Sequence, residues 1–414
     1  MKKLSVLIIL ILLFSSLCFA GNKKQPTPKN LYYDIENMKV DLSTSAIKHL
    51  YNPEPFEQLQ EEVMAGKLNS SQCFYRIKKI LSDYHVVHLS VYRITNIEDN
   101  PLICPISLAC FGNDYYVWIA DLKYSKYLGW KFKGIGDYSI DEVIDIISQY
   151  NSYETPTGKK YFIENTFYAE DYEYFGLMEK GKIPFVLESP EGKVEKVACK
   201  PIPAKKMKSR NIGTVPSEPF CCSHSTLKNY YMRAVPENRT IYIPFNKVVE
   251  TYEYTVNDLF KDITTELKKG TYDTVVFDVR FNPGGNMILM DNALYQNREE
   301  LKKCNLAIVT SGRTFSAACE FINYFLTVFP ETKIFGEETG EAIFNYTDVR
   351  PWNKLKYLNC VFNCPIMIDD LPTLTARATD IYRGTMPDVE VAETYEGYIK
   401  GEDSVYKAIY EYFN

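Results

Sequence analysis

The chain has 414 residues, of which 46% are hydrophobic and 14% aromatic, and its formal net charge is −6. This length and apolar content are sufficient for two or three domains with buried cores. Acidic and basic residues are interspersed along the sequence, so no basic patch or stripe indicates a nucleic-acid-binding protein.

The N-terminus has the pattern of a secretory signal peptide, which we predict for residues 1–20. Two lysines follow Met1, an unbroken apolar run comes next, and Ala20 is a small residue before the expected cleavage point. The apolar run is too short to prefer spanning a bilayer, and nothing later is long enough either. Cys18 raises the alternative of a lipoprotein, but the bulky Leu17 before it favours simple cleavage. We therefore expect an exported protein, periplasmic or extracellular and possibly envelope-associated, with no transmembrane segment in the mature chain.

Residues 21–111 are predicted to form a linker followed by a helical region. The part up to residue 53 is polar and turn-rich. Beyond it, apolar residues at helical spacing mark two short helices, with faces made by Phe56, Leu59 and Val63 and by Phe74, Ile77 and Leu81. The second helix breaks at Ser82-Asp-Tyr-His85. Apolar and polar residues then alternate from Val87, which predicts a half-buried strand.

Residues 112–205 read as short strands around one helix. Ser139 and Glu142 have the spacing of a capping box at the start of this helix. Near the end of the region, Glu191-Gly192 is a plausible turn between two strands. A long, tyrosine-rich insertion occupies residues 152–175.

In residues 206–414 strands alternate with helices, which predicts a parallel sheet with right-handed crossovers. Ligands bind beyond the carboxyl ends of the strands in such sheets, so we expect the site there. The strand ends carry three short motifs, namely Arg280-Phe-Asn-Pro-Gly-Gly285, Ser311-Gly-Arg-Thr-Phe-Ser316 and Gly336-Glu-Glu-Thr-Gly340.

The three segments resemble, in order, motifs of the C-terminal processing (tail-specific) serine proteases: Asp278–Gly285, the nucleophile segment Thr314–Glu320 and Gly336–Gly340. The resemblance implies an α/β fold, α+β overall, with a mostly parallel-sheet protease core of the ClpP/crotonase-like type. It further implies an N-terminal helical segment and, in residues 112–205, a peptide-binding module like a PDZ domain. A β-rich lid without a peptide groove is the alternative for that module.

Ser316 is the predicted nucleophile. It precedes an apolar helical stripe, so it lies where unpaired backbone N–H groups and the positive end of the helix dipole collect. We expect the N–H groups of Ala317, Gly284 and Gly285 to stabilise an oxyanion, because glycines allow close approach of the backbone to a substrate. The alternative is that Ser316 only caps the helix. Ser311 is the nearest rival nucleophile.

A serine nucleophile needs a base. The tail-specific branch uses a lysine in a Gly–Lys step that here is Gly340-Glu341, and no lysine occurs between Lys333 and Lys354. Relatives like the tricorn protease use an N-terminal histidine instead, and Asp83-Tyr-His85 resembles their segment. We therefore predict His85 as the base, with His88 as the alternative. Asp380 lies near the position expected for a distant carboxylate.

Together these features predict an exported serine peptidase that acts on a peptide or protein substrate through Ser316, His85 and Asp380, with no metal or organic cofactor. One alternative is a non-catalytic member of the same fold that binds peptides or another ligand. A second is an esterase, and a third is a structural envelope protein. The spacing of Cys360 and Cys364 is compatible with a zinc site, although free thiols or disulfides are favoured because no partner pair lies at suitable spacing.

Overall fold

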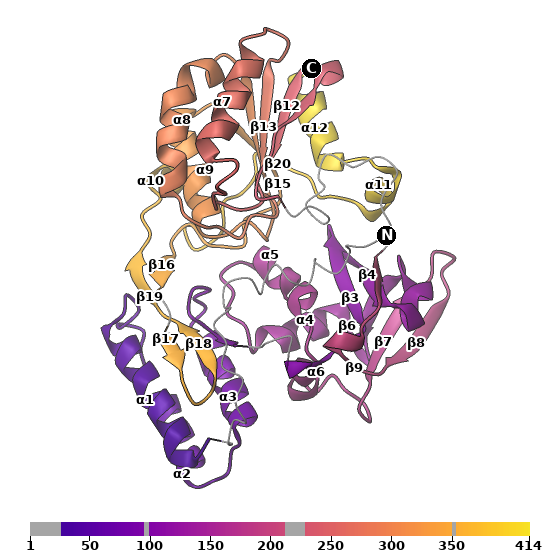
Figure 1. Ribbon diagram of the computed structural model, residues 1–414, viewed down its shortest axis with the longest axis vertical. Helices are drawn as coiled ribbons and strands as arrows, with labels where there is room; N and C mark the ends of the chain where they lie inside the picture. The colour runs from indigo at the N-terminus through magenta and orange to yellow at the C-terminus, as the bar shows by residue number, and fades with distance from the viewer. Residues whose placement is uncertain (1–25, 95–98, 212–227, 350–352) are drawn as a thin grey trace.

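The computed structural model describes residues 26–94, 99–211, 228–349 and 353–414. The predicted signal peptide, Cys221 and Cys222 lie outside the described residues. Figure 1 shows an α/β core at one end of the molecule, with a β-rich module and a helical region side by side at the other end. No helix in the described ranges is long and apolar enough to cross a membrane, and no disulfide bond joins the cysteines in them.

The helical region begins earlier than the sequence analysis expected. Helix α1 (Pro28–Thr44) occupies most of the predicted linker, and α2 (Glu54–Met64) and α3 (Ser70–Ser82) follow it. Thr27 caps α1, whose buried residues Leu31, Ile35, Met38 and Leu42 recur at helical spacing. The polar residues between them hid this stripe, so the linker prediction was wrong for this part of the chain.

Strand β1 (Ser90–Arg93) connects the helical region to a distant part of the chain. It pairs antiparallel with β18 (Cys360–Asn363), which in turn pairs with β17 (Asn353–Leu355). The predicted strand from Val87 therefore starts three residues later than expected. Residues 87–89 form a turn instead, and this turn carries His88.

The β-rich module is a seven-stranded antiparallel sheet in the order β10-β4-β5-β7-β8, with β3 on β4 and β6 on β5. Helix α4 (Ile140–Ser148) begins at the predicted capping box of Ser139 and Glu142. Strand β3 lies before the predicted boundary at residue 112, so the sheet includes part of the preceding segment. The strands are β3 (Ile106–Phe111), β4 (Asp114–Asp121), β5 (Lys131–Ile135), β6 (Tyr138–Ser139), β7 (Ile183–Glu188), β8 (Val194–Cys199) and β10 (Ser209–Asn211).

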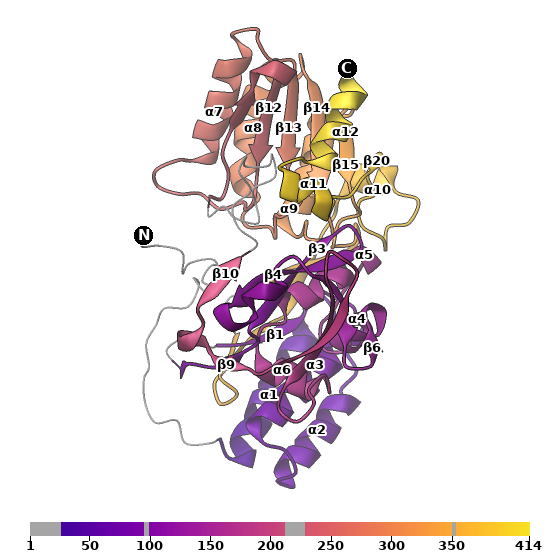
Figure 2. The same ribbon diagram turned by 90° about the vertical axis from the view of Figure 1, so that its right-hand side faces the viewer.

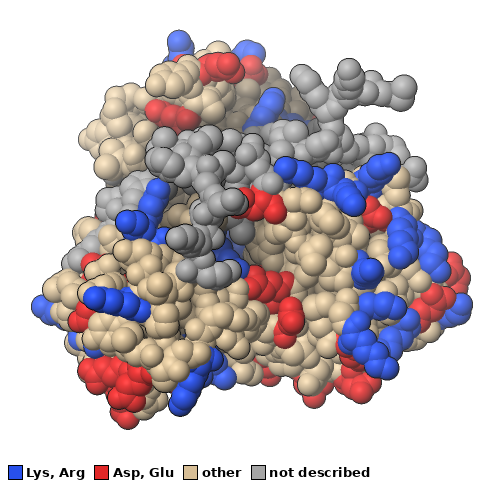
Figure 3. Space-filling model, turned by 60° about the horizontal axis from the view of Figure 1, so that its bottom comes forward, with Lys and Arg blue, Asp and Glu red and all other residues tan. Residues whose placement is uncertain are grey.

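Two further pieces complete the module. The short strands β2 (Leu102–Ile103) and β9 (Ile202–Pro203) pair with each other. The tyrosine-rich insertion contains α5 (Pro156–Lys159) and α6 (Ala169–Tyr174), and in Figure 1 α5 lies at the side of the module that faces the core. Figure 3 shows basic and acidic side chains interspersed on the face that lies at the bottom of Figure 1.

The core is a six-stranded sheet in the order β11-β12-β13-β14-β15-β20, parallel except for β11. Helices α7, α8 and α9 cover one face and α12 covers the other, as Figure 2 also shows. The strands are β11 (Arg233–Val235), β12 (Thr240–Pro244), β13 (Thr274–Asp278), β14 (Asn305–Thr310), β15 (Lys333–Gly336) and β20 (Val389–Glu390). The helices are α7 (Val256–Leu267), α8 (Ile288–Leu301), α9 (Ala317–Val328), α10 (Pro372–Arg377), α11 (Tyr395–Lys400) and α12 (Ser404–Phe413).

The three predicted motifs follow β13, β14 and β15, which are neighbours in this sheet. Their carboxyl ends therefore meet at one edge, as the alternation of strands and helices predicted. The insertion after β15 leaves the core through the pair β16 (Tyr346–Val349) and β19 (Pro365–Ile368). Its β17–β18 hairpin reaches the helical region, where the buried Asp34 carboxylate accepts the N–H groups of Tyr357 and Leu358.

Candidate active site

Ser316 stands at the first turn of α9 in a strained backbone conformation. Its φ of 56° and ψ of −130° are unusual for a residue with a side chain, and such conformations cost on the order of 1–3 kcal/mol. Although Ser316 occupies the capping position, its side chain makes no capping hydrogen bond. The hydroxyl group is therefore available for another partner. The rival Ser311 is buried, and its hydroxyl donates to the carbonyl oxygen of Arg280.

The imidazole beside Ser316 belongs to His88. Its Nε2 lies 3.3 Å from Ser316 Oγ, and its ring stacks on Phe315 with a centroid distance of 4.7 Å. His85, the residue favoured by the sequence analysis, is exposed and has a φ of 50°. The ring of His85 packs edge-on against Tyr153 instead. The turn before β1 thus directs His88 toward Ser316. The prediction of His85 is corrected, because the histidine beside Ser316 is His88.

Glu341 completes the arrangement from the loop after β15. Its Oε1 lies 3.2 Å from His88 Nδ1, and its side chain is only 1% exposed. This contact is within ion-pair distance without the alignment of a hydrogen bond, and neither atom has another hydrogen-bond partner among the described residues. The second oxygen, Oε2, accepts the backbone N–H of Ser316. One carboxylate therefore contacts both His88 and Ser316.

Asp380, the predicted third member, lies elsewhere. It is exposed, and its Oδ1 accepts the N–H of Tyr382 at 2.9 Å. That bond belongs to a local turn. The prediction of Asp380 is corrected, because the carboxylate that contacts His88 is that of Glu341. The sequence did hold a signal for Glu341, because this residue replaces the lysine of the tail-specific branch.

Acidic groups surround His88 on several sides and determine its charge. Burial lowers the pKa of His88, but the contact with Glu341, the charge of Glu341 and the charges of Glu154 and Asp369 raise it more, so the net shift is upward. Burial and the charge of Glu341 raise the pKa of Asp369 to about 6. Burial and the same charge raise the pKa of Glu154 to about 8. The site therefore favours a protonated imidazole, the state that a base reaches after it accepts a proton.

The two glycines of the loop differ in their surroundings: Gly284 lies against Ser316, whereas Gly285 lies against the backbone of Val248. A Cβ on Gly284 would lie 2.6 Å from Ser316 Cβ, so only glycine permits this approach. The Gly284 N–H is already donated to Asn282 Oδ1 at 2.9 Å, and it is therefore unavailable to an oxyanion. The N–H groups of Gly285 and Ala317 have no hydrogen-bond acceptor among the described residues, and Ala317 directly follows Ser316 in the chain.

A buried charge network holds the glycine loop. Arg280 donates to both oxygens of Asp278 at 3.0 Å and to Asp403 Oδ2 at 2.8 Å. Tyr242 accepts from Arg280 at 2.8 Å and donates to Asp278 at 2.6 Å. Because Asp403 also caps α12 through the N–H of Val405, the network joins the loop to the last helix. The structural role expected for Asp278 and Arg280 fits these contacts.

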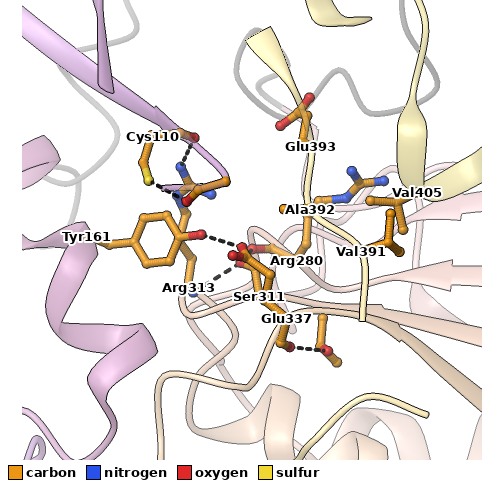
Figure 4. A pocket seen from close by; sticks show the side chains of 12 residues that line it. Cys110, Tyr161, Arg280, Ser311, Arg313, Glu337, Val391, Ala392, Glu393 and Val405 are labelled. Carbon is orange, nitrogen blue, oxygen red and sulfur yellow. Dashed lines mark hydrogen bonds between the residues drawn. The ribbon is translucent and has the colours of Figure 1, made fainter. Parts of the chain in front are cut away.

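The module is held to the core just behind the nucleophile loop. Arg313 makes a bidentate ion pair with Glu164, at 2.9 and 2.7 Å. Tyr161 donates to Glu337 at 2.6 Å. Figure 4 shows Tyr161, Arg313 and Glu337 around a small pocket between the two parts, which Ser311 and Arg280 also line. Within the described ranges, no group of acidic, histidine and cysteine side chains is arranged to hold a metal ion.

No family model and no curated protein sequence matches the chain, but solved structures do. A point mutant of CPAF superposes with a TM-score of 0.61 at 10% identity, covering 92% of this chain and 96% of that one. Mature CPAF complexed with lactacystin gives a TM-score of 0.60 at 10% identity, with 93% and 97% covered. At such identities the likeness shows the fold alone, and the predicted α/β fold with a mostly parallel core sheet is confirmed.

A weaker likeness is to the photosystem II D1 C-terminal processing protease. Its TM-score is 0.43 at 12% identity, with 87% of this chain and 93% of that chain covered.

Proposed function

We propose that this chain is a serine peptidase in which Ser316 is the nucleophile, His88 the general base and Glu341 the acid that orients the base. The observation that carries the proposal is the pair of contacts made by one imidazole. His88 Nε2 lies 3.3 Å from Ser316 Oγ, and Nδ1 lies 3.2 Å from Glu341 Oε1. A carboxylate at Nδ1 favours the tautomer with its proton there, which leaves the Nε2 lone pair directed to the serine.

The reaction follows from this tautomer. Ser316 Oγ attacks a peptide carbonyl carbon while its proton passes to His88 Nε2, and the carbonyl oxygen becomes an oxyanion. His88 then gives that proton to the leaving amine as the C–N bond breaks and an acyl-enzyme forms. Water, deprotonated by His88, releases the acid product and restores the hydroxyl group. The Glu341 carboxylate stabilises the imidazolium in both halves.

The oxyanion has two donors in this proposal, the N–H groups of Gly285 and Ala317. Both lack acceptors among the described residues, and Ala317 is the first residue of α9, where the helix dipole favours negative charge. Each such donor typically lowers the barrier by about 3 kcal/mol. Gly284 contributes by permitting the close approach of the loop to Ser316.

A peptide or protein substrate is the best-supported class. The fold is shared with CPAF, and the resemblance of the three motifs is to proteases that cut peptide bonds. Because a structure of CPAF holds lactacystin, lactacystin is a suitable inhibitor to include among the probes. Export through the predicted signal peptide of residues 1–20 belongs to the same proposal.

A fluorophosphonate probe tests the proposal, with the labelled residue located by mass spectrometry. We expect stoichiometric labelling of Ser316, none in Ser316→Ala, and labelling at least 10³-fold slower in His88→Ala. His85→Ala is the matched control, a second histidine three residues before His88, and it should label at the wild-type rate. Absence of labelling in folded wild-type protein would favour a ligand-binding protein. Turnover of simple esters without turnover of peptides would favour an esterase.

A further inference from the structure

Glu154 joins the two loops that carry the base and the acid. It lies on the segment between α4 and α5 of the β-rich module. Its Oε1 accepts the backbone N–H of Val87 at 3.0 Å, and its Oε2 accepts the backbone N–H of Ala342 at 3.0 Å. Val87 directly precedes His88, and Ala342 directly follows Glu341. One side chain therefore bridges the neighbours of both residues.

The residues around Glu154 reinforce this bridge. Ser152 Oγ donates to the carbonyl oxygens of Leu81 and Leu89, at 3.1 and 3.3 Å, on either side of the histidine turn. Thr155 Oγ1 donates to the carbonyl oxygen of Thr339 at 2.9 Å, two residues before Glu341. The short segment thus binds the histidine turn on one side and the acid-bearing loop on the other.

The backbone N–H groups of Val87 and Ala342 both donate to the Glu154 carboxylate, so this side chain links the two residues directly. The two loops come from parts of the sequence that fold into different regions, the helical region and the core. Their relative position determines the distance from His88 Nδ1 to Glu341 Oε1, and a misplacement of about 1 Å can lower a rate roughly 10²-fold.

We propose that Glu154 is a positioning residue, which holds His88 and Glu341 in register by accepting the N–H groups of Val87 and Ala342. The inference rests on the proposed function and adds a residue to it. Glu154 reaches neither Ser316 nor the imidazole by a hydrogen bond, so it acts through the backbone of its two partners and through its charge.

Ionisation of Glu154 makes this role dependent on pH. An ionised carboxylate accepts through both oxygens, whereas a protonated carboxyl or an amide keeps one good acceptor. Burial and the charge of Glu341 raise the pKa of Glu154 to about 8, against the two N–H groups and the charge of His88. The carboxylate of Asp369 also interacts electrostatically with His88 and Glu341. The bridge is therefore complete above pH 8 and weakened below it.

The test compares Glu154→Gln with wild-type protein at pH 9 and pH 6, measuring kcat and KM for a peptide. At pH 9 we expect kcat to fall about 10- to 100-fold with little change in KM. At pH 6 the difference should shrink, because wild-type Glu154 is then protonated and resembles the amide. Asp171→Asn is the matched control. Asp171 is also a carboxylate whose pKa is raised by burial, but its hydrogen-bond partner is Tyr75, at 2.7 Å. The Asp171→Asn substitution should therefore leave kcat and KM unchanged at both pH values.

The proposal is overturned if folded Glu154→Gln stays within about twofold of wild type at pH 9, or if Asp171→Asn loses as much. Should Glu154→Gln fail to fold, Glu154→Asp serves instead, because it keeps the charge but is too short to reach both N–H groups. Its kcat at pH 9 should fall, and an unchanged value would likewise overturn the proposal.

Failure of the proposed function gives a different result. The chain has four histidines, so the ring resonances of His88 can be followed by NMR in a Ser316→Ala background. Removal of the Glu154 charge should lower the pKa of His88, whether or not the protein is a peptidase. An inactive wild type with this shift would refute the peptidase while retaining the positioning role. An active wild type without it, and without a fall in kcat, would refute the positioning role alone.

Discussion

Replacement of Glu341 by glutamine tests the geometry of the site most sharply, because the two oxygens of this carboxylate have different partners. Oε2 accepts the N–H of Ser316, so this position must remain an oxygen in the amide. The NH₂ group then takes the place of Oε1, which lies 3.2 Å from His88 Nδ1. A donor at that point requires Nδ1 to accept, and the imidazole proton moves to Nε2.

The consequence is a base with its proton on the wrong nitrogen. Nε2–H would face Ser316 Oγ over the 3.3 Å contact and could not take the serine proton. Replacing the acid by its amide in a serine–histidine–acid triad lowers kcat by roughly 10⁴-fold for this reason. We expect a loss of this size in Glu341→Gln, with the folded structure retained.

The assay is the pseudo-first-order rate of fluorophosphonate labelling, together with peptide turnover. Asp380→Asn is the control, since it makes the same chemical change at the exposed carboxylate that the sequence analysis favoured. It should label at the wild-type rate. A Glu341→Gln variant within about tenfold of wild type would contradict the role of Glu341, and a loss in Asp380→Asn instead would indicate Asp380 as the orienting acid.

Three further outcomes are expected. Because the base must be neutral and its neighbours raise the pKa of His88 above 6.5, kcat/KM should rise with pH through a midpoint above 6.5, and a lower midpoint would contradict the charges assigned to the site. Gly285→Ala should abolish labelling and lower the melting temperature, because its Cβ would lie 2.1 Å from the carbonyl oxygen of Val248. Gly192→Ala is the control: no atom lies within 4 Å of the new Cβ, so this variant should still be labelled. Arg280→Met leaves two buried carboxylates without their cation and should lower the free energy of unfolding in urea by about 3–5 kcal/mol, and a loss below about 1 kcal/mol would show that the network contributes little.

The position of the loop that carries Ser316 could be predicted from the sequence because its geometry is encoded locally. The glycine pair, Ser316 and the apolar stripe of α9 lie within one stretch of alternating strands and helices, and neighbouring parallel strands bring their ends together. Even there, the sequence could not show that the Gly284 N–H is donated to Asn282. That detail depends on the turn made by the asparagine side chain.

The base and its acid could not be derived in the same way. His85 and His88 are three positions apart, and the choice between them depends on where the turn ends and β1 begins. That boundary is determined by pairing of β1 with β18, a strand from the far end of the chain. The sequence shows that Glu341 occupies the position where the tail-specific branch has a lysine. A departure from a motif does not show which side chain the replacing residue contacts. Glu154, from a third region, carried no local signal at all.

The central claim, that His88 activates Ser316, is tested most directly by chemical rescue. The second-order rate constant of fluorophosphonate labelling is measured for His88→Ala with and without added imidazole, which can occupy the space that the side chain leaves. We expect slow labelling of His88→Ala that added imidazole accelerates in a concentration-dependent manner, at Ser316 alone. Labelling of His88→Ala at the wild-type rate without imidazole would contradict it.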